Sequence, residues 1–508
     1  MAIATPQQKL AASLEVLRDL QAGGRRVFRS ADISRTHRER LRDNGFLAEI
    51  IKGWWMSTSP KSSPGDTTQW YASFWAFCTA YCEARFGENW HLSPEQSLML
   101  HAESNWVPSQ LVVYAPKGSN NNTQLLHGTS IYDLRQKKMP PPDDLTVREG
   151  LRVFTPEAAL VKLNETFFQR NPVEVQVVLA ALGQGAPLLS RLLDGGHSTV
   201  AGRLAGALRR MGRSDQADRI VLTMTTAGYD VRESDPFALD VAVARAPNRM
   251  SPISGRLAAL WKTHRNGVLA HMPPPPGQAG DANAYLRAVQ DSYRQDAYHS
   301  LSIEGYSVTP DLVERVRDGR WNPEQDGDDQ EDRDALAARG YFQAFERVKA
   351  DIGAILGGAA PAKRVRSGVG EWYLQLFAPS VAAGLMKPRD LAGYRDQPVY
   401  IRASRHVPPR AEVVPDAMDA LFGLLDEESE PAVRAVLGHW MLGYVHPYPD
   451  GNGRIARFLM NVMLASGGYP WTVIRVQDRA EYMSALEAAS VSGDVSLFAR
   501  FIATRVGA

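Results

Sequence analysis

Apolar side chains recur every three or four residues along much of the chain, which is the spacing of one face of an α-helix. The first such stripe is formed by four leucines near the N-terminus: Leu10, Leu14, Leu17 and Leu20. Two further stripes lie on either side of a short run rich in proline and glycine. The stripe before the run contains Val433, Val436, Leu437, Trp440, Met441, Tyr444 and Val445, and the stripe after it contains Ile455, Phe458, Leu459, Val462 and Met463. The pattern predicts two helices separated by a sharp break.

The segment 69–86 is rich in aromatic residues at helical spacing, which predicts a buried helix. The residues on this face are Trp70, Phe74, Phe77, Cys78 and Tyr81. Farther along, QLVVYA at 110–115 predicts a β-strand, and GLRVFTPEAAL at 150–160 predicts a strand that leads into a capped helix. Residues 67–235 are therefore predicted to form a mixed α+β domain.

Residues 1–66 combine helix and turn signals in an order that is typical of a winged helix. After the leucine stripe, Ser30 or Asp32 is expected to cap a second helix that continues through Leu41. A turn at Asn44-Gly45, followed by a short two-stranded segment that ends in Lys-Gly-Trp, would complete the motif.

Two stretches rich in proline, serine and glycine, at 57–68 and 271–280, are typical of linkers. They lead us to expect a multidomain chain. Its predicted parts are a winged-helix-like domain (1–66), an α+β domain (67–235), a helical connector with a proline-rich linker (236–280) and a mainly α-helical domain (281–508).

The composition is that of a globular protein. The 508 residues are 44% hydrophobic and carry a net charge of +1, so the overall charge points to neither nucleic acid nor membrane as a partner. No apolar run reaches transmembrane length and the N-terminus lacks the apolar core of a signal peptide, so we expect a cytoplasmic protein without a membrane partner. The two cysteines, Cys78 and Cys82, have no second Cys or His pair at zinc spacing and are interpreted as buried thiols.

One segment, 25–52, departs from this charge balance because its basic residues clearly outnumber its acidic ones. Arg35, Arg38 and Arg42 share one face of the predicted second helix, and such a face could meet the phosphates of double-stranded DNA. A solvated charged helix in a small packing module explains the same residues, and the sequence leaves both interpretations open.

The strongest chemical pattern is HPYPDGNGRIAR at 446–457, between the two C-terminal apolar stripes. Its prolines end the first helix, and its Gly-Asn-Gly run lets the backbone approach a ligand at the N-terminus of the second, where free N–H groups form an anion site. Asp450 supplies the hard carboxylate oxygen that Mg²⁺ prefers beside phosphates, and Arg454 and Arg457 add positive charge. His446 suits the removal of a proton from an attacking hydroxyl.

This stretch resembles the signature of the Fic family, H-x-F-x-[DE]-G-N-G-R-x-x-R, at every constrained position except Tyr448, where phenylalanine is usual. The resemblance implies a mainly α-helical domain with a small β-hairpin flap, which uses Mg²⁺ and ATP to attach AMP to a hydroxyl of a target protein. It assigns His446 as the general base and Asp450 as the metal ligand. The residues that it assigns to ATP and its phosphates are Gly451, Asn452, Gly453, Arg454 and Arg457.

The segment from Gln397 to Pro409 looks like the flap of this family, which docks the target through backbone pairing. The residues expected to form its strand are Val399, Tyr400, Ile401 and Arg402.

Upstream, SLSIEG at 300–305 matches the family's inhibitory motif, [ST]-x-x-x-E-[GN], on a helix expected near 296–306. Its motif residues are Ser300, Glu304 and Gly305. The resemblance implies that Glu304 pairs with Arg457 and prevents productive placement of the γ-phosphate. An exposed helical glutamate without a regulatory role is the alternative.

Residues 1–235 resemble AbiE-type antitoxins in layout and in short phrases such as HLSPEQSLMLHAESNW and FTPEAALVKL. Those proteins join a winged helix that represses their own operon to a domain that neutralises a toxin. The main hypothesis is therefore an auto-inhibited AMP transferase with a DNA-binding front end, acting on a Ser, Thr or Tyr hydroxyl. One alternative is a DNA-binding regulator whose Fic domain senses ATP or modifies only itself. Another is an enzyme whose donor is UTP or a phosphocholine diphosphate.

Overall fold

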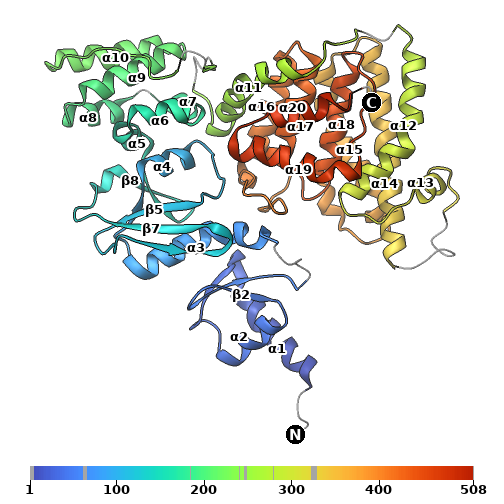
Figure 1. The fold of residues 1–508 in the computed structure, drawn as a ribbon, viewed down its shortest axis with the longest axis horizontal. Coiled ribbons are helices and arrows are strands. Elements are labelled where there is room, and N and C mark those ends of the chain that lie inside the picture. The colour runs from blue at the N-terminus through green and yellow to red at the C-terminus, as the bar shows by residue number, and fades with distance from the viewer. Residues whose placement is uncertain are drawn as a thin grey trace. The chain divides into compact units, whose positions relative to one another are not determined.

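The computed structural model describes residues 5–60, 66–183, 185–238, 241–244, 249–277, 280–321 and 329–506. These residues divide into two compact units. The first contains the described residues up to 238, together with Arg249 and the segment Tyr400–Val407, and the second contains the remainder. In Figure 1 most of the first unit is coloured blue to green and carries the described strands, whereas the second is mostly yellow to red and helical.

The N-terminal part of the first unit is a small antiparallel sheet with two helices. Its elements are α1 (Pro6–Leu20), β1 (Val27–Arg29), α2 (Arg35–Asp43), β2 (Leu47–Ile51) and β3 (Trp54–Ser57), with the strand order β1-β3-β2. The leucine stripe is confirmed as part of α1. A compact apolar core is formed by Leu17, Phe28, Ile33, Leu41, Leu47 and Trp55.

The predicted caps of the second helix are wrong. The hydroxyl of Ser34 accepts the N–H of His37, so α2 begins later than expected. The two predicted cap residues are engaged elsewhere, because Ser30 accepts the indole N–H of Trp55 and Asp32 accepts the N–H of Arg29.

The middle of the first unit confirms the predicted mixed α+β character. Its helices are α3 (Thr68–Phe86), α4 (Pro94–His101) and α5 (Pro156–Lys162), and its strands are β4 (His91–Leu92), β5 (Gln110–Ala115), β6 (Asn121–Gln124), β7 (Ser130–Arg135), β8 (Leu145–Arg148) and β9 (Leu151–Phe154). The larger sheet has the order β4-β5-β7-β6, with β5 and β7 parallel, and β8 pairs with β9. Cys78 and Cys82 are buried in this core, as expected, and burial raises the pKa of both thiols.

The first unit continues in a set of shorter helices: α6 (Glu165–Arg170), α7 (Pro172–Ala181), α8 (Ala186–Asp194), α9 (Ser198–Arg210) and α10 (Ser214–Thr226). None of the described helices is by itself long and apolar enough to cross a membrane. The bent pair α7 and α8 meets that criterion only when its two members are taken together.

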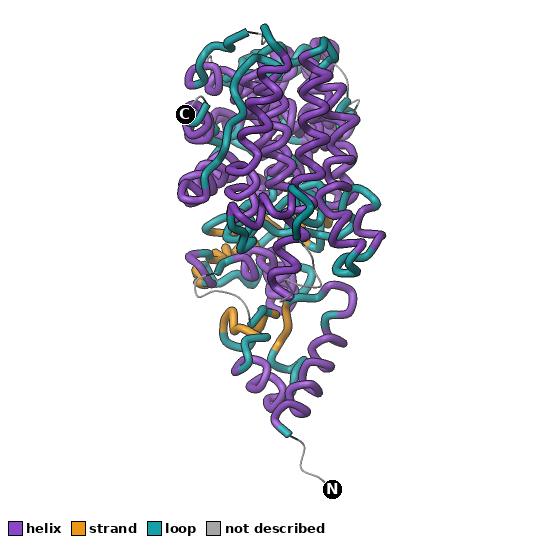
Figure 2. Tube along the Cα trace, turned by 90° about the vertical axis from the view of Figure 1, so that its right-hand side faces the viewer, coloured by secondary structure: helices purple, strands orange, loops and turns teal. Residues whose placement is uncertain are grey.

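The second unit is built from helices that pack side by side, as Figures 1 and 2 show. They are α11 (Pro252–His271), α12 (Ala282–Ile303), α13 (Pro310–Arg317), α14 (Asp329–Leu356), α15 (Pro361–Ala382), α16 (Val414–Glu427), α17 (Pro431–Val445), α18 (Asn452–Ala465), α19 (Arg479–Glu487) and α20 (Ser496–Ala503). The two C-terminal stripes are confirmed as α17 and α18. Both are buried along nearly their whole length, so the core fixes the loop between them.

Candidate active site

The centre of the site is the loop between α17 and α18, residues 446–451. His446 ends α17 in the left-handed region, with φ of 51°, and Gly451 precedes α18 with φ of 81°. Two left-handed residues turn the chain sharply between the helices. The left-handed conformation costs a non-glycine residue about 1–2 kcal/mol, so the contacts around His446 must hold it there.

Asn452 fixes the shape of this loop. Its Oδ1 accepts the N–H of Tyr448 at 2.9 Å, and its Nδ2 donates to the carbonyl of Tyr448 at 2.8 Å. The ring of Tyr448 is 2% exposed and stacks on Tyr373, with 4.1 Å between centroids. The ring thus fills a buried position. Because the Asn452 side chain is bonded to the backbone, its predicted phosphate contact would have to come from its own N–H.

Asp450, in this loop, and Arg454, in the first turn of α18, contact each other. The Asp450 side chain is 60% exposed; one carboxylate oxygen accepts the Gly451 N–H at 2.6 Å and the other lies 3.4 Å from Nη2 of Arg454. The Arg454 side chain is 1% exposed, and its guanidinium lies over the rings of Tyr306 and Phe377. Arg454 is thus a buried support for Asp450, and its contact with a phosphate stays a prediction.

His446 has the protonation state that a general base requires. Its Nδ1 lies 3.3 Å from the carbonyl of Gly443, which only accepts, so the proton is assigned to Nδ1 and Nε2 is left basic. Burial lowers the pKa of His446 to about 4, and the charge of Arg395 acts in the same direction. The Gly443 carbonyl, Glu304 and Asp450 oppose this shift without reversing it. The imidazole is therefore neutral at physiological pH.

Arg457, on α18, is bound to the end of α12. Its Nε donates to the Ser300 hydroxyl at 2.8 Å, and its Nη2 donates to the Ser300 carbonyl at 3.1 Å and to Oε1 of Glu304 at 2.7 Å. The side chain of Arg457 is 4% exposed. Since α12 ends at Ile303, Glu304 is its C-cap, and Gly305 follows with φ of 91°. The motif residues Ser300 and Glu304 therefore meet Arg457, and Gly305 lets the chain turn away.

The carboxylate of Glu304 also lies against the first turn of α18. A Cβ added to Gly453 would lie only 2.3 Å from Oε1 of Glu304, so the oxygen closely approaches the backbone there. The first N–H groups of an α-helix have no partner within the helix and attract anions. Burial opposes ionisation of Glu304, but the charges of Arg457 and Arg454 outweigh it and hold the pKa of Glu304 below its ordinary value.

The predicted flap does not have its expected structure. No strand is present among the described residues 397–409, so the strand expected at Val399, Tyr400, Ile401 and Arg402 is wrong. The backbone that follows is already bonded within the first unit: the Ala403 N–H donates to the Thr68 hydroxyl, and the Arg405 carbonyl accepts the Val107 N–H, both at 2.9 Å. Target docking by residues 399–402 remains a prediction.

Arg395 is a residue of this site that the sequence did not reveal. It is 4% exposed, its Nε donates to the His446 carbonyl at 2.8 Å, and its backbone N–H donates to the Pro447 carbonyl at 2.9 Å. It lies far from the HPYPDGNGRIAR run in the sequence, and a single arginine in a loop carries no chemical pattern of its own. Only the folded structure brings it to the loop.

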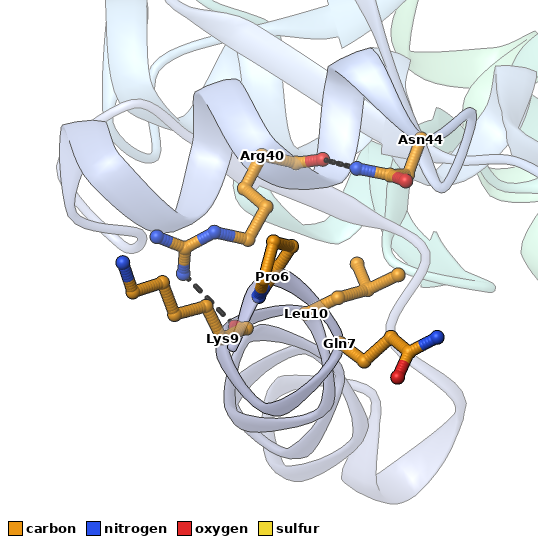
Figure 3. Close-up of a pocket in the computed structure, with 6 residues that line it drawn as sticks. All are labelled: Pro6, Gln7, Lys9, Leu10, Arg40 and Asn44. Atoms are coloured by element: carbon orange, nitrogen blue, oxygen red, sulfur yellow. Dashed lines mark hydrogen bonds between the residues drawn. The ribbon is translucent and has the colours of Figure 1, made fainter. Parts of the chain in front are cut away.

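The predicted DNA-contacting arginines of α2 differ in their availability. Arg35 and Arg42 have side chains 82% and 53% exposed and pair with Glu39 and Asp43. Arg38 turns inward, donating to the carbonyls of Ser30 and Ile33. Figure 3 shows the opposite side of α2, where Arg40 donates to the Lys9 carbonyl and borders a small pocket against α1. Only Arg35 and Arg42 of the predicted three are largely open to a ligand.

Comparison with known proteins identifies this part of the chain. The sequence profile of the Fic/DOC family matches residues 369–464, which include α17, the loop and nearly all of α18. Several curated relatives are named protein adenylyltransferase Fic. The one from Nematostella vectensis is 30% identical over 221 residues, or 43% of this chain and 48% of the relative. The one from Drosophila willistoni is 26% identical over 295 residues, or 57% of this chain and 52% of the relative.

Among solved structures, Fic-1 from C. elegans is 17% identical, covers 66% of this chain and 94% of that chain, and has a TM-score of 0.37. A Fic domain containing signaling protein from Bacteroides thetaiotaomicron is 19% identical, covers 48% and 92%, and has a TM-score of 0.34. The chain spans about half the length of the curated relatives it matches. The profile and the relatives show that the second unit contains a Fic domain.

Proposed function

We propose that this chain is a protein adenylyltransferase, which transfers AMP from ATP to a hydroxyl side chain of a target protein. The observation that carries the proposal is the loop 446–451, where a neutral, positioned imidazole precedes the N-terminus of a buried helix. That terminus suits the phosphates of a nucleotide. The Fic profile and the names of the curated relatives support the same activity.

In the proposed reaction, Nε2 of His446 takes the proton of the target hydroxyl while the hydroxyl oxygen forms a bond to the α-phosphorus of ATP. The bond between the α-phosphorus and its bridging oxygen breaks, and pyrophosphate leaves. Backbone N–H groups of Gly453 and its neighbours hold the phosphates, and Arg457 binds the γ-phosphate once it is released from Glu304.

Asp450 is the group proposed to hold Mg²⁺. Its carboxylate is exposed at the same helix N-terminus and offers the hard oxygen that this ion prefers. Among the described residues, no three His, Cys, Asp or Glu side chains gather into a metal site. Such an arrangement fits an ion that is bound by one carboxylate and completed by phosphates and water, where it neutralises phosphate charge.

Glu304 is proposed to act as a built-in brake. Its carboxylate accepts a hydrogen bond from Nη2 of Arg457 and lies against the backbone of Gly453. An arginine fork serves one bidentate partner at a time, and a carboxylate there repels an incoming triphosphate. ATP can therefore bind productively only when Glu304 moves away.

Radiolabelled nucleotides test the activity. The full-length protein carrying Glu304→Gly is incubated with a cell lysate and either α-labelled or γ-labelled ATP. A separate sample contains the double variant Glu304→Gly with His446→Ala as an inactive control. Label from the α-position only, on other proteins, supports the proposal. Label confined to the protein itself favours the ATP-sensing regulator, and competition by UTP or a phosphocholine diphosphate that exceeds competition by ATP favours a different donor.

A second proposed activity is binding of double-stranded DNA by α2, which precedes the β2–β3 hairpin and exposes Arg35 and Arg42. Phosphate contacts make such binding fall steeply with salt. A gel shift with the full-length protein should show binding at low salt, and Arg35→Ala with Arg42→Ala should weaken it. Arg18→Ala, an exposed arginine on α1, is the matched control. Equal binding by the paired variant and the control would assign α2 to packing alone.

A further inference from the structure

The carbonyl groups around Arg395 come from three separate stretches of the second unit. Its Nε and Nη2 donate to the carbonyls of His446 and Val445, at 2.8 and 3.4 Å, at the end of α17. Its Nη1 donates to the Gln397 carbonyl at 3.1 Å, and its Nη2 also donates to the carbonyl of Pro409. Gln397 and Pro409 are the two ends of the segment predicted to dock the target. One guanidinium thus connects both ends of that segment to the residue proposed as general base.

These hydrogen bonds stabilise the chain at the end of α17, where the loop that begins at His446 starts. The last carbonyls of an α-helix have no partner within the helix, and a cation is favoured there. His446 also adopts the left-handed conformation, which requires restraint from its surroundings. Through its side chain and its backbone N–H, Arg395 binds the carbonyls of three consecutive residues, Val445, His446 and Pro447.

We propose that Arg395 is a positioning residue for AMP transfer: it holds the backbone of His446 and the two ends of the docking segment in one fixed arrangement. Arg395 does not touch the reacting atoms in this role. It keeps the backbone of His446 at a constant position relative to Gln397 and Pro409, the two ends of that segment. The inference rests on the proposed adenylyltransferase activity.

The planar guanidinium is essential to this role, because its donors diverge in fixed directions. A lysine at this position would keep the positive charge but could reach fewer of these carbonyls at once. A methionine would keep much of the apolar bulk and none of the donors. Neither change alters the Gly453 backbone or Arg457, so the proposed phosphate site remains intact.

The test uses the full-length protein carrying Glu304→Gly. Turnover is measured as the rate at which label from α-labelled ATP enters the proteins of a cell lysate, and the dissociation constant for ATP is measured separately. Arg395→Met and Arg395→Lys should each lower turnover, the former by about 10²-fold, because misplacing a catalytic group by an ångström costs that much. The dissociation constant for ATP should not change. Arg389→Met is the matched control, since Arg389 has a side chain 79% exposed, and it should transfer AMP at the parent rate.

Turnover that is retained in Arg395→Met would overturn the proposal, and so would a parallel loss of turnover and ATP affinity, which indicates general damage. If Arg395→Met does not fold, as judged by thermal melting, the same criteria apply to Arg395→Lys. If neither variant folds, Arg395 is a folding residue and the proposal is overturned. If Glu304→Gly with Arg395 intact transfers no AMP, the proposed function fails instead.

Discussion

Replacing Glu304 by glycine is the perturbation that separates a brake from an ordinary acidic residue. The change removes the carboxylate that accepts from Nη2 of Arg457 at 2.7 Å and that lies against Gly453. Arg457 keeps its two bonds to Ser300, so its side chain should stay in place. The Glu304 carboxylate then no longer competes with the γ-phosphate for Nη2 of Arg457.

The expected gain follows from the strength of the bond that ATP must displace. A hydrogen bond to a charged group contributes about 1.5–3 kcal/mol. Glu304 is 29% exposed, so solvent screening places the value toward the lower end. Since 1.4 kcal/mol corresponds to a factor of ten, the lower end of this range favours the productive complex by about tenfold. Removal of the carboxylate's repulsion toward the triphosphate acts in the same direction.

Initial rates of label incorporation from α-labelled ATP, over a range of ATP concentrations with Mg²⁺ present, measure this gain. Glu304→Gln, which removes the charge but keeps the shape, should give an intermediate rate. The double variant Glu304→Gly with Arg457→Ala should return to a low rate, because the gain requires the freed guanidinium. A Glu304→Gly protein that labels no faster than the parent at saturating ATP would refute the brake.

Four further outcomes are expected in the Glu304→Gly protein. His446→Ala should reduce AMP transfer by about 10²–10⁴-fold while ATP binding persists, and retained transfer would remove His446 from the role of base. Asp450→Ala should abolish the response of the rate to Mg²⁺, so an unchanged Mg²⁺ titration would place the ion elsewhere. Because burial lowers the pKa of His446 to about 4, kcat/KM should hold steady as pH falls through 6 and decline only near pH 4; a decline centred near the ordinary value of 6.5 would contradict the buried imidazole. Asn452→Ala should lower the free energy of unfolding by about 1–3 kcal/mol, measured in urea, because the backbone of Tyr448 loses two partners; an unchanged midpoint would mean that water replaces them.

The sequence predicted best those features that depend on local pattern. The stripes on either side of HPYPDGNGRIAR became α17 and α18, and the aromatic face at 69–86 became α3, because the periodicity of buried positions determines such helices. The contact between Glu304 and Arg457 also joins residues that a motif had already paired.

Features that depend on partners distant in sequence were not predictable. Arg395 reaches His446 only through the folded chain. The strand expected at 399–402 rested on the resemblance to the family's flap, which does not reveal which backbone lies alongside in this chain, and the backbone that follows is bonded to Thr68 and Val107. Likewise, serine is a residue type that often caps helices, but the hydroxyl of Ser30 accepts a hydrogen bond from the indole N–H of Trp55 instead.

Mass spectrometry of the modified protein tests the central claim most directly. The full-length Glu304→Gly protein is incubated with ATP, Mg²⁺ and a lysate, and the proteins of the mixture are digested and their peptides sequenced. A parallel sample, prepared with the Glu304→Gly, His446→Ala double variant, is the control. AMP joined through its phosphate to the hydroxyl of a Ser, Thr or Tyr side chain is expected in the first sample and not in the control. A phosphoryl group alone at that hydroxyl, or AMP in equal amounts in both samples, would contradict the account.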